Sequence, residues 1–230
     1  MLGLRTALVY SGGVVRPKVP LISRRKALEV ALEIIDSDGL DALSIRRLAT
    51  ALGVNGASLY HHFSGKEDIV AGVVDLALAE VRGVGAPGAS WRTWLPENAR
   101  SLRHALLAHP ALLPVVVGSR SHGLGARLLD ASAARLMGDG VPSAVVMPLL
   151  DALAAFAISS ALHETRSGDP DESAAEEYPA LAKAAAERGL SADQIFDLVT
   201  TSILQAIDTA VEQQRARWMP SIPMPVEGAS

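Results

Sequence analysis

The residues best suited to chemistry lie between Gly53 and Lys66, where a glycine turn is followed by short polar side chains and a lysine. Hydroxyl and amide groups on a helix donate and accept hydrogen bonds at base edges, and longer donors reach phosphate oxygens. Short side chains also let the N-terminus of a helix approach the bases closely. The spacing therefore predicts a DNA-binding surface made of Asn55, Gly56, Ala57 and Ser58 at the bases, with Tyr60 and His61 donating to phosphates.

The elements that must position these residues are three short helices. Apolar residues at helical spacing predict a first helix over 24–37, and Ser44 is a plausible N-cap for a second. Gly53 then supplies a left-handed turn, and Asn55 can cap the third helix. A short helix, a glycine turn and a second helix are typical of a helix-turn-helix DNA-binding unit.

Some residues of this unit have two interpretations. Leu59 and Phe63 are expected in its core, whereas Tyr60 suits either the core or DNA. His61 and His62 point about 100° apart on a helix and cannot easily share one ion, so no metal site is predicted. The run Arg24-Arg25-Lys26 is either a solvated face or a phosphate contact.

A capping box is predicted at Ser64 and Glu67, where each residue would satisfy the other's backbone N–H. A long fourth helix would follow, with apolar positions from Ile69 to Val81, and a linker rich in Gly and Pro would span 83–90. The rest of the chain has helical spacing and no sustained strand pattern. Helices are predicted over 91–108, 111–118, 123–138, 142–165, 174–188 and 191–216.

These elements predict an all-α chain with an N-terminal helix-turn-helix domain and a larger helical domain. The predicted parts are a flexible arm over 1–22, the DNA-binding domain over 23–70, a ligand-binding and dimerisation domain over 71–216, and a disordered tail over 217–230. Charge follows this division: residues 1–66 hold nine basic and five acidic groups, although the whole chain carries a net charge of -4. A basic head on an acidic body suits a protein that presents one end to DNA.

Other classes of protein fit poorly. The chain has no cysteine, which excludes disulfides and thiolate chemistry, and no apolar run approaches the roughly 18 residues of a membrane span. No Ser/His/Asp arrangement or metal cluster supports an enzyme, and no cofactor is implied. We therefore expect a cytoplasmic protein that binds no membrane.

The helix-turn-helix segment resembles the DNA-binding domain of the tetracycline-repressor (TetR) family over about residues 24–80. The resemblance is carried by L-S-I-R-R-L-A-T-A-L-G-V-N-G-A-S-L-Y-H-H-F-S-G-K, in which L-Y-x-H-F-x-x-K is the most specific part. It implies that Ser44 and Tyr60 bind phosphate and that Arg46 reaches a base or a phosphate. Lys66 would bind phosphate where free N–H groups begin the fourth helix.

The resemblance also implies a homodimer formed by two long helices, here 142–165 and 191–216, whose apolar stripes would pack as a four-helix bundle across a two-fold axis. An ordinary intramolecular core is the other interpretation of these stripes. A dimer would place two recognition helices about one DNA turn apart, on a roughly palindromic operator.

A small-molecule effector is the second partner that the resemblance implies. Asn98 lies where the tetracycline-binding subgroup has a ligand-binding Asn, but Val116 and Arg82 replace its two ligand-binding histidines. These departures argue against a Mg²⁺-tetracycline ligand and favour a largely apolar one. The predicted pocket consists of Asn98, Leu102, Leu106, Val116, Ser119, Leu149, Leu153, Phe156 and His163.

The preferred hypothesis is a homodimeric repressor that such a ligand releases from DNA. A DNA-binding protein without an effector, either architectural or constitutive, is the main alternative. An enzyme that uses the helical cavity is the weaker one.

Overall fold

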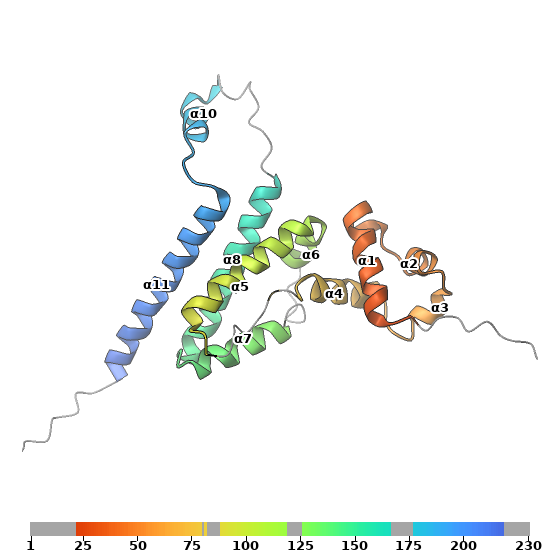
Figure 1. The fold of residues 1–230 in the computed structure, drawn as a ribbon, viewed down its shortest axis with the longest axis horizontal. Coiled ribbons are helices and arrows are strands. Elements are labelled where there is room, and N and C mark those ends of the chain that lie inside the picture. Colours follow the sequence, from red (N-terminus) through yellow and green to blue (C-terminus); the bar gives the residue numbers. More distant parts are fainter. Residues whose placement is uncertain (1–21, 80, 82–87, 119–125, 167–176, 219–230) are drawn as a thin grey trace, which may run out of the picture.

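The computed structural model describes residues 22–79, 81, 88–118, 126–166 and 177–218. These residues form helices and connecting turns, which confirms the predicted all-α fold (Figure 1). A small helical domain holds the N-terminal elements, and a larger helical body holds the rest. The arm and tail predicted at the two ends lie almost wholly outside the described residues.

The small domain contains the predicted helix-turn-helix and one short 3₁₀ turn that the sequence pattern did not indicate. Its elements are α1 (Arg24–Asp38), η1 (Leu40–Ala42), α2 (Ile45–Leu52), α3 (Gly56–Leu59) and α4 (Lys66–Ala77).

Local capping explains where the helices of the small domain begin. The Ser44 Oγ accepts a hydrogen bond from the Arg47 N–H at 3.1 Å, and the Asn55 Oδ1 accepts one from the Ala57 N–H at 3.1 Å. Both caps agree with the sequence prediction. Gly53 has a φ of 67°, the left-handed conformation that ends α2.

The capping box predicted for α4 is wrong. Gly65 is the N-cap residue, and the residue that bonds Ser64 is Asp68, whose Oδ2 accepts the Ser64 N–H at 3.0 Å. The extended backbone at Gly65 shifts the helix start by one residue, so Asp68 replaces Glu67 as the partner. The helix also ends at Ala77, earlier than predicted.

The core of the small domain is formed by α1 to α4. Leu59 and Phe63 are 1% and 2% exposed, which confirms them as core residues. α1 and α4 cross very closely at Gly72, where an added Cβ would lie 2.7 Å from Leu28 Cδ2. A side chain at this position would therefore require the Leu28 side chain to move.

The body is built around three long helices, with α5 packed against both α8 and α11. Ser191 and Gln194 form a capping box at the start of α11, with reciprocal hydrogen bonds of 2.8 and 3.1 Å. The elements of the body are α5 (Trp91–Ala108), η2 (Pro110–Leu112), α6 (Leu113–Gly118), α7 (Ala126–Gly138), α8 (Ser143–Arg166), α10 (Pro179–Ala186) and α11 (Ala192–Trp218).

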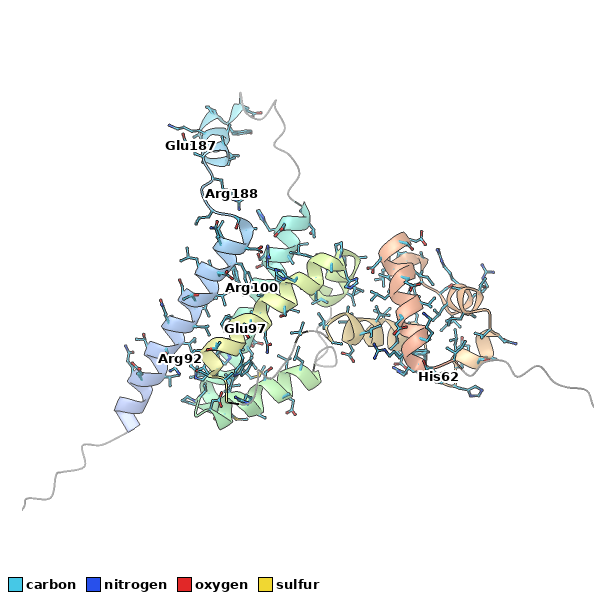
Figure 2. The ribbon with its side chains drawn as sticks, viewed as in Figure 1. His62, Arg92, Glu97, Arg100, Glu187 and Arg188 are labelled. Atoms are coloured by element: carbon cyan, nitrogen blue, oxygen red, sulfur yellow. The ribbon has the colours of Figure 1, made fainter. Side chains whose placement is uncertain are left out.

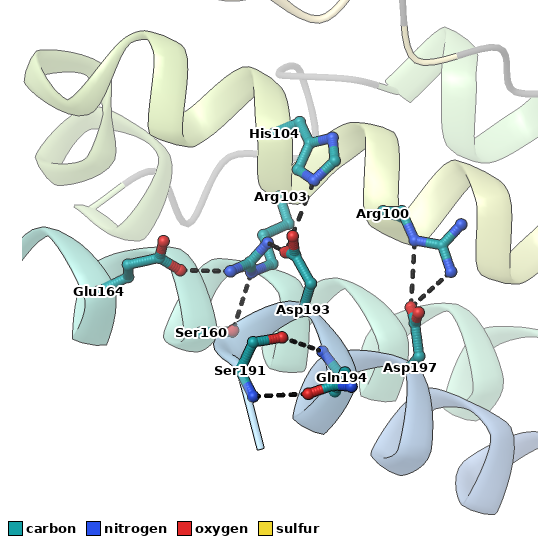
Figure 3. A network of polar contacts seen from close by, with 9 residues as sticks. All are labelled: Arg100, Arg103, His104, Ser160, Glu164, Ser191, Asp193, Gln194 and Asp197. Atoms are coloured by element: carbon teal, nitrogen blue, oxygen red, sulfur yellow. Dashed lines mark hydrogen bonds and ion pairs between the residues drawn. The ribbon is translucent and has the colours of Figure 1, made fainter. Parts of the chain in front are cut away.

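Arg103 on α5 ties the three long helices together (Figure 3). Its guanidinium is 1% exposed and donates to Ser160 Oγ at 3.1 Å, to Asp193 Oδ1 at 2.5 Å and to Glu164. Ser160 and Glu164 belong to α8, and Asp193 begins α11. A buried charge is tolerated only with such partners, so the three helices are held at one relative position.

Two further arginines of α5 extend this contact along α11, as Figure 2 shows for Arg92 and Arg100. Arg100 donates to Asp197 Oδ1 at 3.1 and 2.5 Å, and Arg92 donates from Nε to Asp208 Oδ2 at 2.6 Å. The residue numbers of the acidic partners fall along α11 as those of the arginines rise along α5. The two helices therefore run antiparallel.

α8 is a longer apolar helix than the sequence analysis predicted. It is long and apolar enough to cross a membrane, so the expectation that no run reaches that length is wrong here. α5 with α6 would add a second such segment only if the pair, bent by 99°, were one span. Only 33% of the most apolar window of α8 is buried, and core helices of soluble proteins meet the same criteria.

Candidate DNA interface and ligand cavity

The predicted base-reading residues lie together on one exposed surface of the small domain. Asn55 and Ala57 are exposed, whereas Gly56 and Ser58 are half-buried. Tyr60 follows with 62% of its surface exposed, which excludes the core alternative for this residue. His61 is also exposed beside it. The surface therefore combines small side chains with an aromatic hydroxyl and an imidazole.

Capping leaves specific donors available on this surface. The oxygen of the Asn55 side chain accepts from the Ala57 N–H, so its NH₂ group stays available to donate outward. The Ser44 hydroxyl accepts from the Arg47 N–H, which leaves its own proton for an acceptor such as a phosphate. Arg46 is exposed on α2, the helix that Ser44 caps.

Lys66 holds the start of α4 against the preceding elements. Its Nζ donates to the carbonyl oxygen of Leu40 at 3.2 Å, and the side chain is half-buried. An ammonium group carries three protons, so two donors remain for an anion. The free backbone N–H groups of the first turn of α4 add to the positive potential there.

Arg24 clamps the end of the helix-turn-helix to α4. Its guanidinium donates to the His62 carbonyl oxygen and, at 2.7 Å, to Asp68 Oδ1, and it lies 4.5 Å from the centre of the Phe63 ring. The Arg24 hydrogen bond, followed by the Ser64 backbone N–H, holds the pKa of Asp68 below its usual 3.8.

The basic run at the start of α1 therefore has divided roles. Arg25 and Lys26 both pair with Glu29, at 3.0 and 3.7 Å, and belong to the solvated face. Arg24 is a structural residue of the domain. The run as a whole is therefore neither a solvated face nor a phosphate contact, the two roles that the sequence suggested.

The body contains a small, partly open cavity between α5, α7 and α8. Its volume is about 70 Å³, and its wall includes three predicted pocket residues, Asn98, Leu102 and Leu153. Asn98 hydrogen-bonds to none of the described residues, so its amide is available to a ligand. The remaining lining residues are Val81, Leu95, Ala99, Leu128, Leu129, Ser132, Leu150 and Ala154.

The other predicted pocket residues lie elsewhere. Phe156 and His163 line an open groove of about 480 Å³ between the end of α8 and the start of α11. Leu149 is fully buried in the core of the body. Leu106 and Val116 pack around Leu113 and Ala161, and Ser119 falls outside the described residues. The single predicted pocket is therefore divided among a cavity, a groove and two core regions.

Sequence reasoning missed the contribution of α7 to the cavity. Leu128, Leu129 and Ser132 line it, and their i, i+1, i+4 spacing was the available signal. Reasoning also missed the polar contact between the small domain and the body, in which Nδ1 of His109 lies 2.8 Å from Asp36 Oδ2. No local pattern links residues this far apart. Among the described residues, no group of three or more His, Asp or Glu side chains could hold a metal ion.

A helix-turn-helix with an exposed, donor-rich third helix and a separate helical body defines a DNA-binding regulator of two domains. Comparison with known families agrees. Residues 27–73 match the profile "Bacterial regulatory proteins, tetR family", and residues 84–211 match "Tetracyclin repressor-like, C-terminal domain". The chain therefore belongs to the tetracycline-repressor family of regulators.

Individual relatives agree with this assignment. The chain is 38% identical over 91 residues to an HTH-type transcriptional regulator of Saccharopolyspora erythraea, a match that covers 40% of this chain and 39% of that protein. It is 32% identical over 146 residues to the tetracycline repressor class A from transposon 1721 of Escherichia coli, covering 63% and 67% of the two chains.

A solved structure with a similar fold contains a bound small molecule. It is the Streptomyces coelicolor TetR family protein ActR in complex with actinorhodin, which matches with a TM-score of 0.65 and 26% identity. The match covers 83% of this chain and 98% of that one.

We predict that Asp68→Asn lowers the free energy of unfolding at neutral pH by up to about 1 kcal/mol, because the exposed Arg24 pair is lost. The folded pKa of Asp68 lies below 3.8, so its contribution is complete above that value and is lost as pH falls through the folded pKa. Urea denaturation across this acidic range should show a steeper loss of stability in the natural protein than in the variant. Asp75→Asn, an exposed change on the same helix, is the control. Identical pH profiles for Asp68→Asn and the natural protein would contradict the prediction.

Proposed function

We propose that the chain is a homodimeric repressor that binds a roughly palindromic operator and is released by a small, largely apolar ligand. The observation that carries the proposal is the exposed surface of α3 and Tyr60, framed by Ser44 and Lys66 with unused donors. Because the proposed partner is genomic DNA, the protein would act in the cytoplasm. The roles of individual residues follow from the atoms that the fold leaves available.

On DNA, α3 would enter the major groove with Asn55 to Ser58 at the base edges. Tyr60, His61 and Ser44 would donate to phosphates, and Arg46 would reach a base or a phosphate. Lys66 would bind a phosphate at the start of α4. Phosphate contacts fix the position of the protein and base contacts supply specificity, so the two groups should affect binding differently.

The homodimer is supported by the outward faces of α8 and α11. Leu198 is 59% exposed and Met147 is 45% exposed, and neither is covered by its own chain. Small residues, including Ala152 and Ala155 of α8 and Ala206 of α11, continue these faces and allow close helix packing. Asp151 lies on the exposed side of α8, where a lipid environment would be costly and a protein partner is suitable. A second copy would bury both faces in a four-helix bundle.

The effector is placed in the cavity of α5, α7 and α8. Its lining is apolar except for Asn98 and Ser132, a composition that suits a largely apolar ligand with one or two polar groups. Small-molecule sites usually measure about 300–1,000 Å³. The cavity of about 70 Å³ must therefore expand, and movement of α7 away from α5 and α8 is the simplest way.

The small volume also favours the alternative of a regulator without an effector. The structure of ActR supports the ligand-responsive function instead, because it is a complex with actinorhodin. A ligand screen against the protein–DNA complex separates the two functions.

We predict that Tyr60→Ala and Lys66→Ala each weaken DNA binding at least tenfold, because each removes a phosphate contact. The measurement is fluorescence anisotropy with duplexes selected by the natural protein from a random DNA library. Lys66→Ala should weaken binding to all DNA sequences alike. It should also reduce the slope of log K, the logarithm of the binding constant, against the logarithm of the salt concentration by about one. Lys183→Ala, an exposed lysine of α10, should bind normally. Near-natural affinity of both test variants would refute the assignment.

Substitution of the exposed leucine of α11, Leu198→Lys, is expected to convert the dimer into monomers, because a charge would be buried in the bundle. Sedimentation equilibrium across a range of protein concentrations measures this shift. Met137→Lys introduces the same charge at a 49% exposed site on α7 and should leave the dimer intact. Equal masses for Leu198→Lys and the natural protein would place the dimer interface elsewhere.

For the effector, Asn98→Leu should retain operator affinity within about twofold but weaken the response to a releasing ligand about tenfold or more, because it removes a polar anchor from the wall of the cavity. The ligand is first identified by screening compounds for disruption of the protein–DNA complex. Asn98 lies on α5, outside the helix-turn-helix domain, so titration of Asn98→Leu and the natural protein with that compound isolates the effector step. An unchanged ligand response would place the ligand outside this cavity.

A further inference from the structure

We propose that the last turn of α1 transmits the state of the ligand cavity to the DNA-binding surface, through the contact between Asp36 and His109. This inference rests on the proposed function. It adds a second connection to α4, which joins the two domains along the chain.

The polar part of the connection is a hydrogen bond between the domains. Nδ1 of His109 lies 2.8 Å from Asp36 Oδ2, and both side chains are partly buried, with 25% and 33% exposed. The carboxylate only accepts, so the imidazole donates from Nδ1. His109 directly follows α5, at the point where the chain bends by 99° into η2 and α6. A shift of the last turn of α5, beyond Arg103, would therefore displace His109 directly.

The apolar part is a continuous path of packed side chains. Leu102 lines the cavity and also packs on the cluster of Leu106, Leu113 and Ala161. Val116 packs on that cluster and on the core of the small domain. Leu112, 2% exposed, is the buried residue that the described part of the body contributes to that core. Figure 1 shows α6 beside α1 at this contact.

From α1 the connection continues to the DNA-binding surface. Asp38, two residues after Asp36, pairs with Arg47 on α2, the first helix of the helix-turn-helix. The last turn of α1 therefore carries one carboxylate bonded to the body and another bonded to the DNA-binding unit. A rotation of this turn would move α2 together with the recognition surface. Coupling through such a contiguous set of contacts acts equally in both directions.

Reciprocity allows a test with DNA as the only ligand. The probe is an operator duplex selected by the natural full-length protein, and hydrogen–deuterium exchange is measured with and without it. In the natural protein, DNA should change exchange in peptides of α5 and α6 as well as α3. In Asp36→Ala and His109→Ala the change in α3 should remain, and the change in α5 and α6 should fall by at least half.

Two further variants make the outcome decisive. Glu33→Ala, an exposed change on α1, should behave like the natural protein. A double variant, with Asp36→His and His109→Asp in one chain, reverses the hydrogen bond and should restore the DNA-induced change in α5 and α6. Three outcomes would overturn the proposal. The DNA-induced change in α5 and α6 could be unaltered in the single variants, it could be missing from the natural protein, or the double variant could fail to restore it. Failure of the natural protein to select any DNA would instead refute the proposed function itself.

Discussion

A guanidinium removed from water must keep its hydrogen-bond acceptors, and the body of this protein is organised around one such group. Arg103 is bonded to α8 and to α11 while it belongs to α5, so none of these helices can move away without leaving a buried charge uncompensated. Its acceptors Asp193 and Glu164 remain partly exposed, so their carboxylates stay hydrated when the arginine does not. α5 and α8 also form two walls of the cavity. The position of the cavity relative to the outer faces of α8 and α11 is therefore fixed by this group.

Features that depend on neighbouring residues were predictable from the sequence. The helix starts after Ser44 and Asn55 and the turn at Gly53 follow from side chains within three residues of the backbone that they satisfy. Ser64 shows where such reasoning fails. Asp68 and Glu67 are both acidic and both near the helix start, and the backbone angle at Gly65 decides which one is bonded. That angle is not encoded by the residue pattern around it.

The ligand cavity was the least predictable part. Leu102 and Leu149 have the same chemistry and similar spacing, yet one lines a cavity and the other is completely buried in the core. The difference arises from how α5, α7 and α8 cross, which depends on contacts between residues far apart in the chain. The resemblance to a family supplied Asn98 as a cavity residue, whereas the periodicity of the helices alone could not have separated it from its neighbours.

The close crossing of α1 and α4 at Gly72 has a consequence for the mechanics of the small domain. A glycine inside a helix weakens that helix by roughly 0.5–1 kcal/mol relative to alanine. α4 is only twelve residues long and carries this weak point in its middle, directly under Leu28. Its stiffness therefore depends on α1 remaining in contact, and the two helices together behave as a single lever.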